Sequence, residues 1–182
     1  MNIFYTDTCP VKSAQALCDK HVVKMPLESA QMLCTAHRVL ALGTTADGYP
    51  IDYGDSELRF DKLGMYKSTH YNHPSSVWTR KSFHNYKWLF NHYLALCLEY
   101  QYRYTRVHKC FQLAEDLNKV PKQLSNHSPS EVFEPPPACM PDEYKISNDV
   151  TKCYKLYLQK EKASFSKWST RHAPVWWGSV SP

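Results

Sequence analysis

Helical periodicity is clearest in Asp19-Lys20-His21-Val22-Val23-Lys24-Met25-Pro26-Leu27-Glu28-Ser29-Ala30-Gln31-Met32-Leu33. At helical spacing, one row of i+3 and i+4 steps is polar along its whole length and contains His21, Lys24, Glu28, Gln31, Thr35 and Arg38. Apolar side chains flank the row, with Val22, Val23, Leu27, Ala30 and Leu33 on one side and Met25, Met32 and Val39 on the other. A narrow polar row between apolar flanks indicates a helix that lines a groove.

This polar row has two interpretations. His21, Lys24 and Glu28 bring an imidazole, an amine and an acid within two turns, and these groups suit acid–base chemistry. The alternative is a solvated helix face with an ordinary Lys24–Glu28 ion pair. Pro26 adds a bend beside these residues, because it either kinks one helix or starts a second helix at its first turn.

Composition predicts one compact domain, since 182 residues can bury a substantial core. Lys and Arg outnumber Asp and Glu by 22 to 17, a mild bias that permits an anionic partner such as nucleic acid without establishing one. The many aromatic residues serve core packing and base stacking equally well. The sequence has neither a G-x-G-x-x-G nor a G-x-x-x-x-G-K-[ST] motif, which argues against a Rossmann dehydrogenase or a nucleotide-driven motor.

Cysteine usage and the N-terminus predict a soluble, cytoplasmic protein, or one in the host cytoplasm if the chain is viral. The seven cysteines are scattered without a C-x-x-C motif, so we expect them to be reduced. Residues 1–7 lack the features of a signal peptide, and no apolar run is long enough to cross a membrane. His70 and His73 lie three residues apart just before a proline, and this spacing matches no standard zinc-binding motif. We therefore expect no metal and no cofactor.

The chain as a whole predicts an all-α fold, a compact single-domain helical bundle with a long central helix and long loops. The expected helices are one that starts after a Thr8 cap, its continuation from Pro26 to Leu40, one from Ser75 or Ser76 to about Arg106, one over 111–120 and one over 148–168. The third of these is the longest, with an apolar stripe of Leu89, Tyr93, Leu96, Tyr100 and Tyr104. Residues 43–69 are expected to form a long loop, with or without a short turn of helix, and residues 121–138 a proline-bearing connector, with Trp176 or Trp177 docked on the body.

Two motifs give the chain a family resemblance. Asp19-Lys20-His21 is followed by Glu28, and Asn72-His73-Pro74 is followed by Trp78. With a weaker likeness over 96–100, residues 1–108 resemble the pyrimidine-dimer DNA glycosylases, small all-helical repair enzymes of the phage endonuclease V type and their bacterial relatives. Residues 109–182 form a C-terminal extension without a counterpart in the resemblance.

The resemblance implies a mechanism for this chain. In that family the terminal amine attacks the sugar C1′ atom, a glutamate assists, and basic residues hold a kinked duplex with one nucleotide flipped out. It therefore implies that Glu28 and His21 belong to the site. Asn2 departs from the small residue of the family, and its bulk predicts that Met1 is retained. The nucleophile is thus left open between the Met1 amine, Lys24 or Lys20, and a water activated by Glu28.

Our leading hypothesis is an enzyme that acts on a damaged or modified base of double-stranded DNA at its glycosidic bond. Glu28 is the expected acid–base residue, with His21 and Lys24 beside it. The expected DNA contacts are Lys20, Arg38, Asn72, His73, Arg80, Arg103 and Arg106. Two alternatives remain. One is a non-catalytic helical protein with the same scaffold that binds DNA or acts as an inhibitor, and the other is a small-molecule enzyme that acts on a nucleotide.

Overall fold

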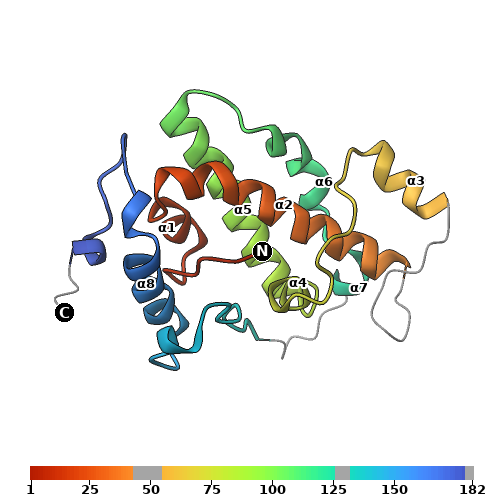
Figure 1. Ribbon diagram of the computed structural model, residues 1–182. Helices are drawn as coiled ribbons and strands as arrows, with labels where there is room; N and C mark the ends of the chain where they lie inside the picture. Colours follow the sequence, from red (N-terminus) through yellow and green to blue (C-terminus); the bar gives the residue numbers. More distant parts are fainter. Residues whose placement is uncertain (43–54, 126–131, 179–182) are drawn as a thin grey trace.

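The computed structural model describes residues 1–42, 55–125 and 132–178 (Figure 1). Within these ranges all regular secondary structure is helical, which confirms the predicted all-α class. The α-helices are α1 (Pro10–Gln15), α2 (Asp19–Leu42), α3 (Asp55–Lys62), α4 (Pro74–Thr79), α5 (Phe83–Tyr104), α6 (Ala114–Asn118), α7 (Lys122–Ser125) and α8 (Val150–Glu161). Short 3-10 helices are η1 (Lys109–Leu113), η2 (Asp142–Tyr144), η3 (Ala163–Phe165) and η4 (Val175–Gly178). None of the helices described is long and apolar enough to cross a membrane.

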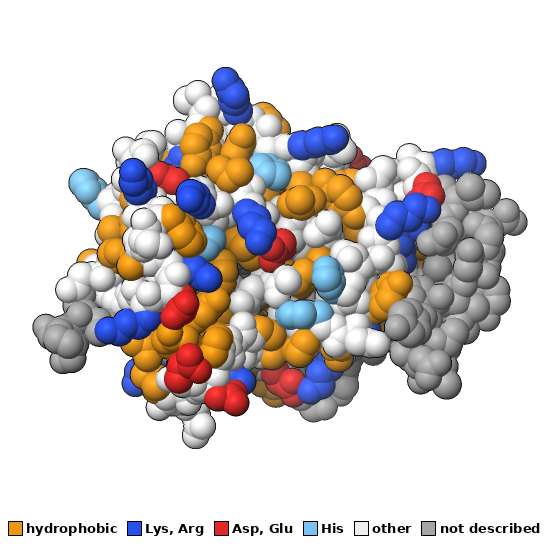
Figure 2. Space-filling model, in the orientation of Figure 1, with side chains coloured by type: hydrophobic (Ala, Val, Ile, Leu, Met, Phe, Trp, Pro, Cys, Tyr) orange, Lys and Arg blue, Asp and Glu red, His pale blue; other side chains and the backbone are white. Residues whose placement is uncertain are grey.

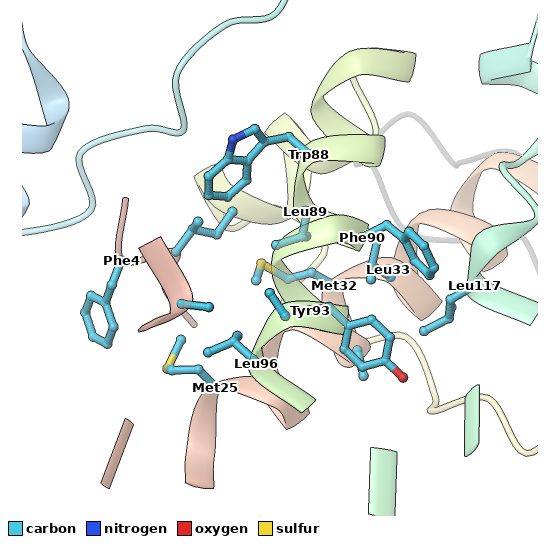
Figure 3. Packing of buried hydrophobic residues seen from close by; sticks show 14 of the residues in the cluster. Phe4, Met25, Met32, Leu33, Trp88, Leu89, Phe90, Tyr93, Leu96 and Leu117 are labelled. Carbon is cyan, nitrogen blue, oxygen red and sulfur yellow. The ribbon is translucent and has the colours of Figure 1, made fainter. Parts of the chain in front are cut away.

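The core forms where α2 crosses α5 near the middle of the molecule (Figure 1). Leu89, Tyr93 and Leu96 on α5 have no exposed surface, and they pack toward Met32 and Leu33 on α2 (Figure 3). Complete burial of each large apolar side chain contributes about 1.5–3 kcal/mol to folding. The expected central helix and the buried part of its apolar stripe are therefore confirmed.

Pro26 lies inside α2, and the helix continues through it. This settles the choice that the sequence left open between one helix and two. Because proline has no amide hydrogen, the carbonyl of Val22 lacks its usual partner one turn earlier. The helix is held at this point by its neighbours, since Val22 and Met25 are both buried.

The predicted helix from Ser75 or Ser76 to Arg106 was wrong, because the chain breaks between α4 and α5. Ser82 is extended, with φ −147° and ψ 157°, and its hydroxyl accepts a hydrogen bond from the Asn85 amide at 3.1 Å. A serine that caps a new helix cannot also continue the previous one. The cap of α4 is His73, whose Nδ1 accepts from the Ser75 amide at 3.2 Å.

Other predicted helix limits also needed correction. The residue before α1 is Cys9, which makes no side-chain cap, so the expected cap at Thr8 was wrong. Residues 111–120 divide between η1 and α6, and α8 ends at Glu161 instead of near residue 168. Of the predicted loop over 43–69, residues 43–54 lie outside the described residues, and residues 55–62 form α3.

The C-terminal aromatic residues dock on the body of the protein as predicted. Trp176 and Trp177 are partly buried against the core cluster. The Gln159 side-chain amide of α8 donates to the Trp176 carbonyl at 2.5 Å. In Figure 1 this part of the chain lies beside α8, at the edge of the molecule.

Candidate active site

Glu28 is the centre of the site. Its Oε2 accepts a hydrogen bond from the main-chain amide of Asn2 at 3.0 Å, and its Oε1 lies 2.9 Å from Lys24 Nζ. The Glu28 side chain is only 13% exposed, whereas that of Lys24 is 68% exposed. The fold thus places the start of the chain directly against a largely buried carboxylate. Figure 1 shows the N-terminus beside α2 in the middle of the molecule.

A pocket of about 380 Å³ surrounds this carboxylate. Three separate parts of the chain line it: the first residues, the beginning of α2, and the region around the end of α8. The lining residues are Met1, Asn2, Phe4, Lys20, His21, Lys24, Met25, Glu28, Tyr157, Lys162 and Phe165. The volume lies within the range of about 300–1,000 Å³ that is usual for small-molecule sites.

His21 is a buried wall of this pocket. Its Nδ1 lies 3.5 Å from Cys18 Sγ, and its ring centroid is 4.5 Å from that of Phe4. Burial lowers the pKa of His21 to about 4, and the ammonium groups of Lys162 and Lys24 add to this effect. His21 is therefore a neutral imidazole near pH 7, so it does not serve as a cationic acid there.

The polar row on α2 faces the pocket only in its first half, so the predicted groove along the whole row was wrong. Thr35 and Arg38 are completely buried. The Arg38 guanidinium lies 2.6 Å from Asp61 Oδ1, and it donates to the carbonyls of Tyr66 and Met65. Arg38 thus joins α2 to the segment after α3. This guanidinium is not available to a DNA phosphate, and we correct that expectation.

Arg103 is also structural. Its side chain is 1% exposed, and it forms ion pairs with Glu99 at 2.8 Å and Asp19 at 2.9 Å. Its remaining contact is the carbonyl of Gln15 at 3.1 Å. Arg103 therefore fixes the junction of α1 and α2 on α5, and we correct its expected role in phosphate binding. Asp19, part of the motif that gave the resemblance, serves the same junction.

The other predicted DNA contacts are at least partly accessible. Lys20 is exposed and lines the pocket, with Nζ 4.8 Å from the centroid of Phe165. Asn72 and Arg106 are exposed. Arg80 is half-buried and donates to the Tyr71 carbonyl at 2.6 Å.

His73 combines its capping role with a position near the N-terminus. Burial lowers the pKa of His73, and the nearby N-terminal ammonium lowers it further. The structure thus brings the start of α4 close to the Glu28 pocket.

The sequence analysis missed Phe4 near the N-terminus and three pocket residues late in the chain, Tyr157, Lys162 and Phe165. The last three lie in α8, in η3 and at the residue between them, where periodicity favoured a helix with one apolar face and a solvated basic face. The only available signal was an excess of aromatic and basic residues in that region, which does not identify a pocket. No group of three or more His, Cys, Asp or Glu side chains suited to a metal occurs among the described residues.

Lys and Arg side chains are scattered over the upper and central part of the face shown in Figure 2, and several acidic side chains lie toward its lower left edge. The fold and the site together define an all-helical protein with a carboxylate-centred pocket bordered by lysines. Such a surface suits an anionic substrate.

The model of the family described as pyrimidine dimer DNA glycosylase matches residues 1–112, and the chain belongs to this family. The matched segment contains Glu28, His21 and Lys24. Family membership indicates a DNA glycosylase-like enzyme whose substrate is DNA. No curated protein and no solved structure is matched.

Proposed function

We propose that the protein excises a base from double-stranded DNA by cleaving its glycosidic bond, with Glu28 as the acid–base residue. The observation that supports this most strongly is the placement of Glu28. The carboxylate is largely buried in a pocket and lies next to the main-chain nitrogen of residue 2 and the ammonium of Lys24. A carboxylate in this position stabilises positive charge on the sugar and transfers protons.

The chemistry proceeds at the sugar C1′ atom. The nucleophile attacks C1′, the bond from C1′ to the base nitrogen breaks, and the base leaves with the bonding electrons and takes up a proton. When the nucleophile is an amine, Glu28 accepts the proton that the amine loses. Opening of the sugar ring then gives an imine, which borohydride reduces to a stable adduct.

The nucleophile that the geometry favours is an amine at the start of the chain. The main-chain amide of Asn2 is 3.0 Å from Glu28, and Met1, which carries the terminal amine, lines the same pocket as this proton acceptor. Lys24 is the less suitable candidate, because it is mostly exposed and serves as the counter-ion of Glu28. His21 contributes a neutral wall, and Lys20, Asn72, Arg80 and Arg106 are the proposed DNA contacts.

Glu28→Gln tests this proposal. We expect at least a ~100-fold loss of base release from ultraviolet-irradiated duplex DNA, with folding and DNA binding retained, because the amide cannot accept a proton. Glu115→Gln is the matched control, since the Glu115 side chain is 91% exposed. A folded, DNA-binding Glu28→Gln protein with full activity would exclude the proposed role.

Borohydride trapping identifies the nucleophile and separates the alternatives. The protein is incubated with normal, irradiated and modified-base duplexes, and the adduct is located by mass analysis. An adduct at the N-terminal residue supports the terminal amine as the nucleophile. An adduct at Lys24 or Lys20 identifies that lysine as the nucleophile instead. Released base without an adduct indicates water. DNA binding that falls with salt, without adduct or released base, indicates the non-catalytic alternative, and preference for a mononucleotide indicates a small-molecule enzyme.

A further inference from the structure

The segment after residue 112 lies outside the family match, yet it supplies one wall of the Glu28 pocket. Tyr157, Lys162 and Phe165 line the same cavity as Glu28 and His21. Phe165 contacts the edge of His21, with ring centroids 5.7 Å apart. The pocket is therefore completed by residues that the family model does not include.

Asn2 attaches this segment to the start of the chain. Its side-chain amide donates to the Cys139 carbonyl at 2.9 Å, and its Oδ1 accepts from the Tyr154 hydroxyl at 2.6 Å. Tyr154 belongs to α8 and has no exposed surface. Asn2, which stands where the family has a small residue, thus binds the additional segment through its side chain. Its main-chain amide contacts Glu28.

The far end of the wall is fixed as well. The Asp19 amide donates to the Lys167 carbonyl at 2.8 Å, and the Ser169 amide and hydroxyl both donate to Asp19 Oδ2, at 2.9 and 2.8 Å. Arg171 forms two hydrogen bonds with Glu99, at 2.6 and 2.9 Å. Since η3 lies between these contacts and α8, Phe165 is held in place across the beginning of α2.

The chemistry of the wall suits a planar aromatic ligand next to a phosphate. The rings of Phe165 and Tyr157 join Phe4 and His21 around the cavity. Two ammonium groups lie over the rings of the wall, Lys20 at 4.8 Å from Phe165 and Lys162 at 5.0 Å from Tyr157. Aromatic side chains stack on nucleobases, and lysines beside them pair with the phosphates of the DNA backbone.

We propose that Tyr157, Lys162 and Phe165 form the surface that binds one extruded nucleobase, so that the segment beyond the family match determines which base the enzyme accepts. This inference rests on the proposed function. The rings make the base contact, and Lys162 pairs with an adjacent phosphate. The residues select the substrate, while Glu28 carries out the chemistry.

The test measures binding, so that it does not depend on turnover. Phe165→Leu is introduced into the Glu28→Gln protein, and affinities are compared for duplexes with a photodimer, uracil, a methylated purine or a tetrahydrofuran abasic analogue at one position. The parent protein is expected to prefer at least one base-containing duplex over the abasic analogue. Phe165→Leu is expected to lower that preference about 10-fold and to leave affinity for the abasic duplex unchanged.

Two controls accompany this experiment. Phe111→Leu removes a partly buried ring outside the pocket and should leave the preference unchanged. Lys162→Met should weaken binding of all the duplexes and reduce the slope of log affinity against log salt concentration by about one. Lys160 is an exposed residue on α8, and Lys160→Met should have a smaller effect on both quantities.

The outcomes separate the two proposals. A parent protein without preference for any base, or a Phe165→Leu variant with unaltered preference, overturns the inference. Equal weakening of the base-containing and abasic duplexes by Phe165→Leu overturns it too, because that result indicates general damage. Failure of the wild-type protein to release a base from any duplex contradicts the proposed function, whatever the binding result.

Discussion

Two arginines show how burial decides the role of a residue. Arg103 lies in the last turn of α5 and Arg106 lies just beyond its left-handed cap at Thr105, and both were expected to contact DNA. The Arg103 side chain is 1% exposed and ion-paired with Glu99 and Asp19, whereas Arg106 is exposed. Charges that are removed from water must be paired, so Arg103 belongs to the folded structure, and Arg106 is still a candidate for DNA binding.

Arg103→Met is expected to destabilise the protein by about 3 kcal/mol, because Glu99 and Asp19 each lose an ion-pair partner and Glu99 keeps only Arg171. Arg106→Met, the matched control, should change the free energy of unfolding by no more than about 0.5 kcal/mol. Urea unfolding measures both. Equal stability of the two variants would contradict a structural role for Arg103.

At the scale of elements, the decisive feature is the break between α4 and α5. Ser82 caps α5, and Trp78 at the end of α4 accepts hydrogen bonds at its carbonyl from the Lys81 amide at 3.2 Å and the Asn85 side chain at 3.1 Å. These contacts fix the turn between the two helices. Through this turn α4 is directed toward the N-terminus, where Ser76 Oγ lies 3.7 Å from Met1 Sδ.

Ser82→Ala is expected to lower the free energy of unfolding by about 1 kcal/mol, because the Asn85 amide loses its cap. Ser164→Ala, at an exposed position in η3, serves as the control and should have little effect. Thermal and urea unfolding measure the difference. A Ser82→Ala protein as stable as the Ser164→Ala protein would show that the cap does not stabilise α5.

At the scale of the whole molecule, three buried histidines link stability to pH. Burial lowers the pKa values of His21, His37 and His92 to about 4 each. Their folded pKa values lie below the ordinary value near 6.5, so the unfolded chain binds protons first as the pH falls. Their contribution to stability is complete above pH 6.5 and is lost as the pH falls toward 4.

We therefore expect the free energy of unfolding to fall between pH 7 and pH 5 by about 2 kcal/mol for each histidine, a figure that follows from the shift of each pKa. Urea unfolding at several pH values measures this slope. His92→Gln should reduce the slope by about one third, whereas substitution of the exposed His172 should leave it unchanged. A constant free energy of unfolding over this range would contradict the linkage.

Spacing along the chain was enough to predict the helical class, a long central helix and the closeness of His21, Lys24 and Glu28. These features depend on spacing along one helix, where residues three and four apart share a face. The family resemblance followed from the same local motifs, and the family match confirms it.

Packing between distant segments determines which half of the α2 row faces a pocket. Thr35 and Arg38 continue the row of Glu28 at the same spacing, yet the segment after α3 covers them. Packing also determines that Tyr157 and Phe165 meet Glu28, since these residues are far apart in the chain and come together only when α8 and η3 pack on the N-terminus. Periodicity defines the face of a helix, but packing defines what covers that face.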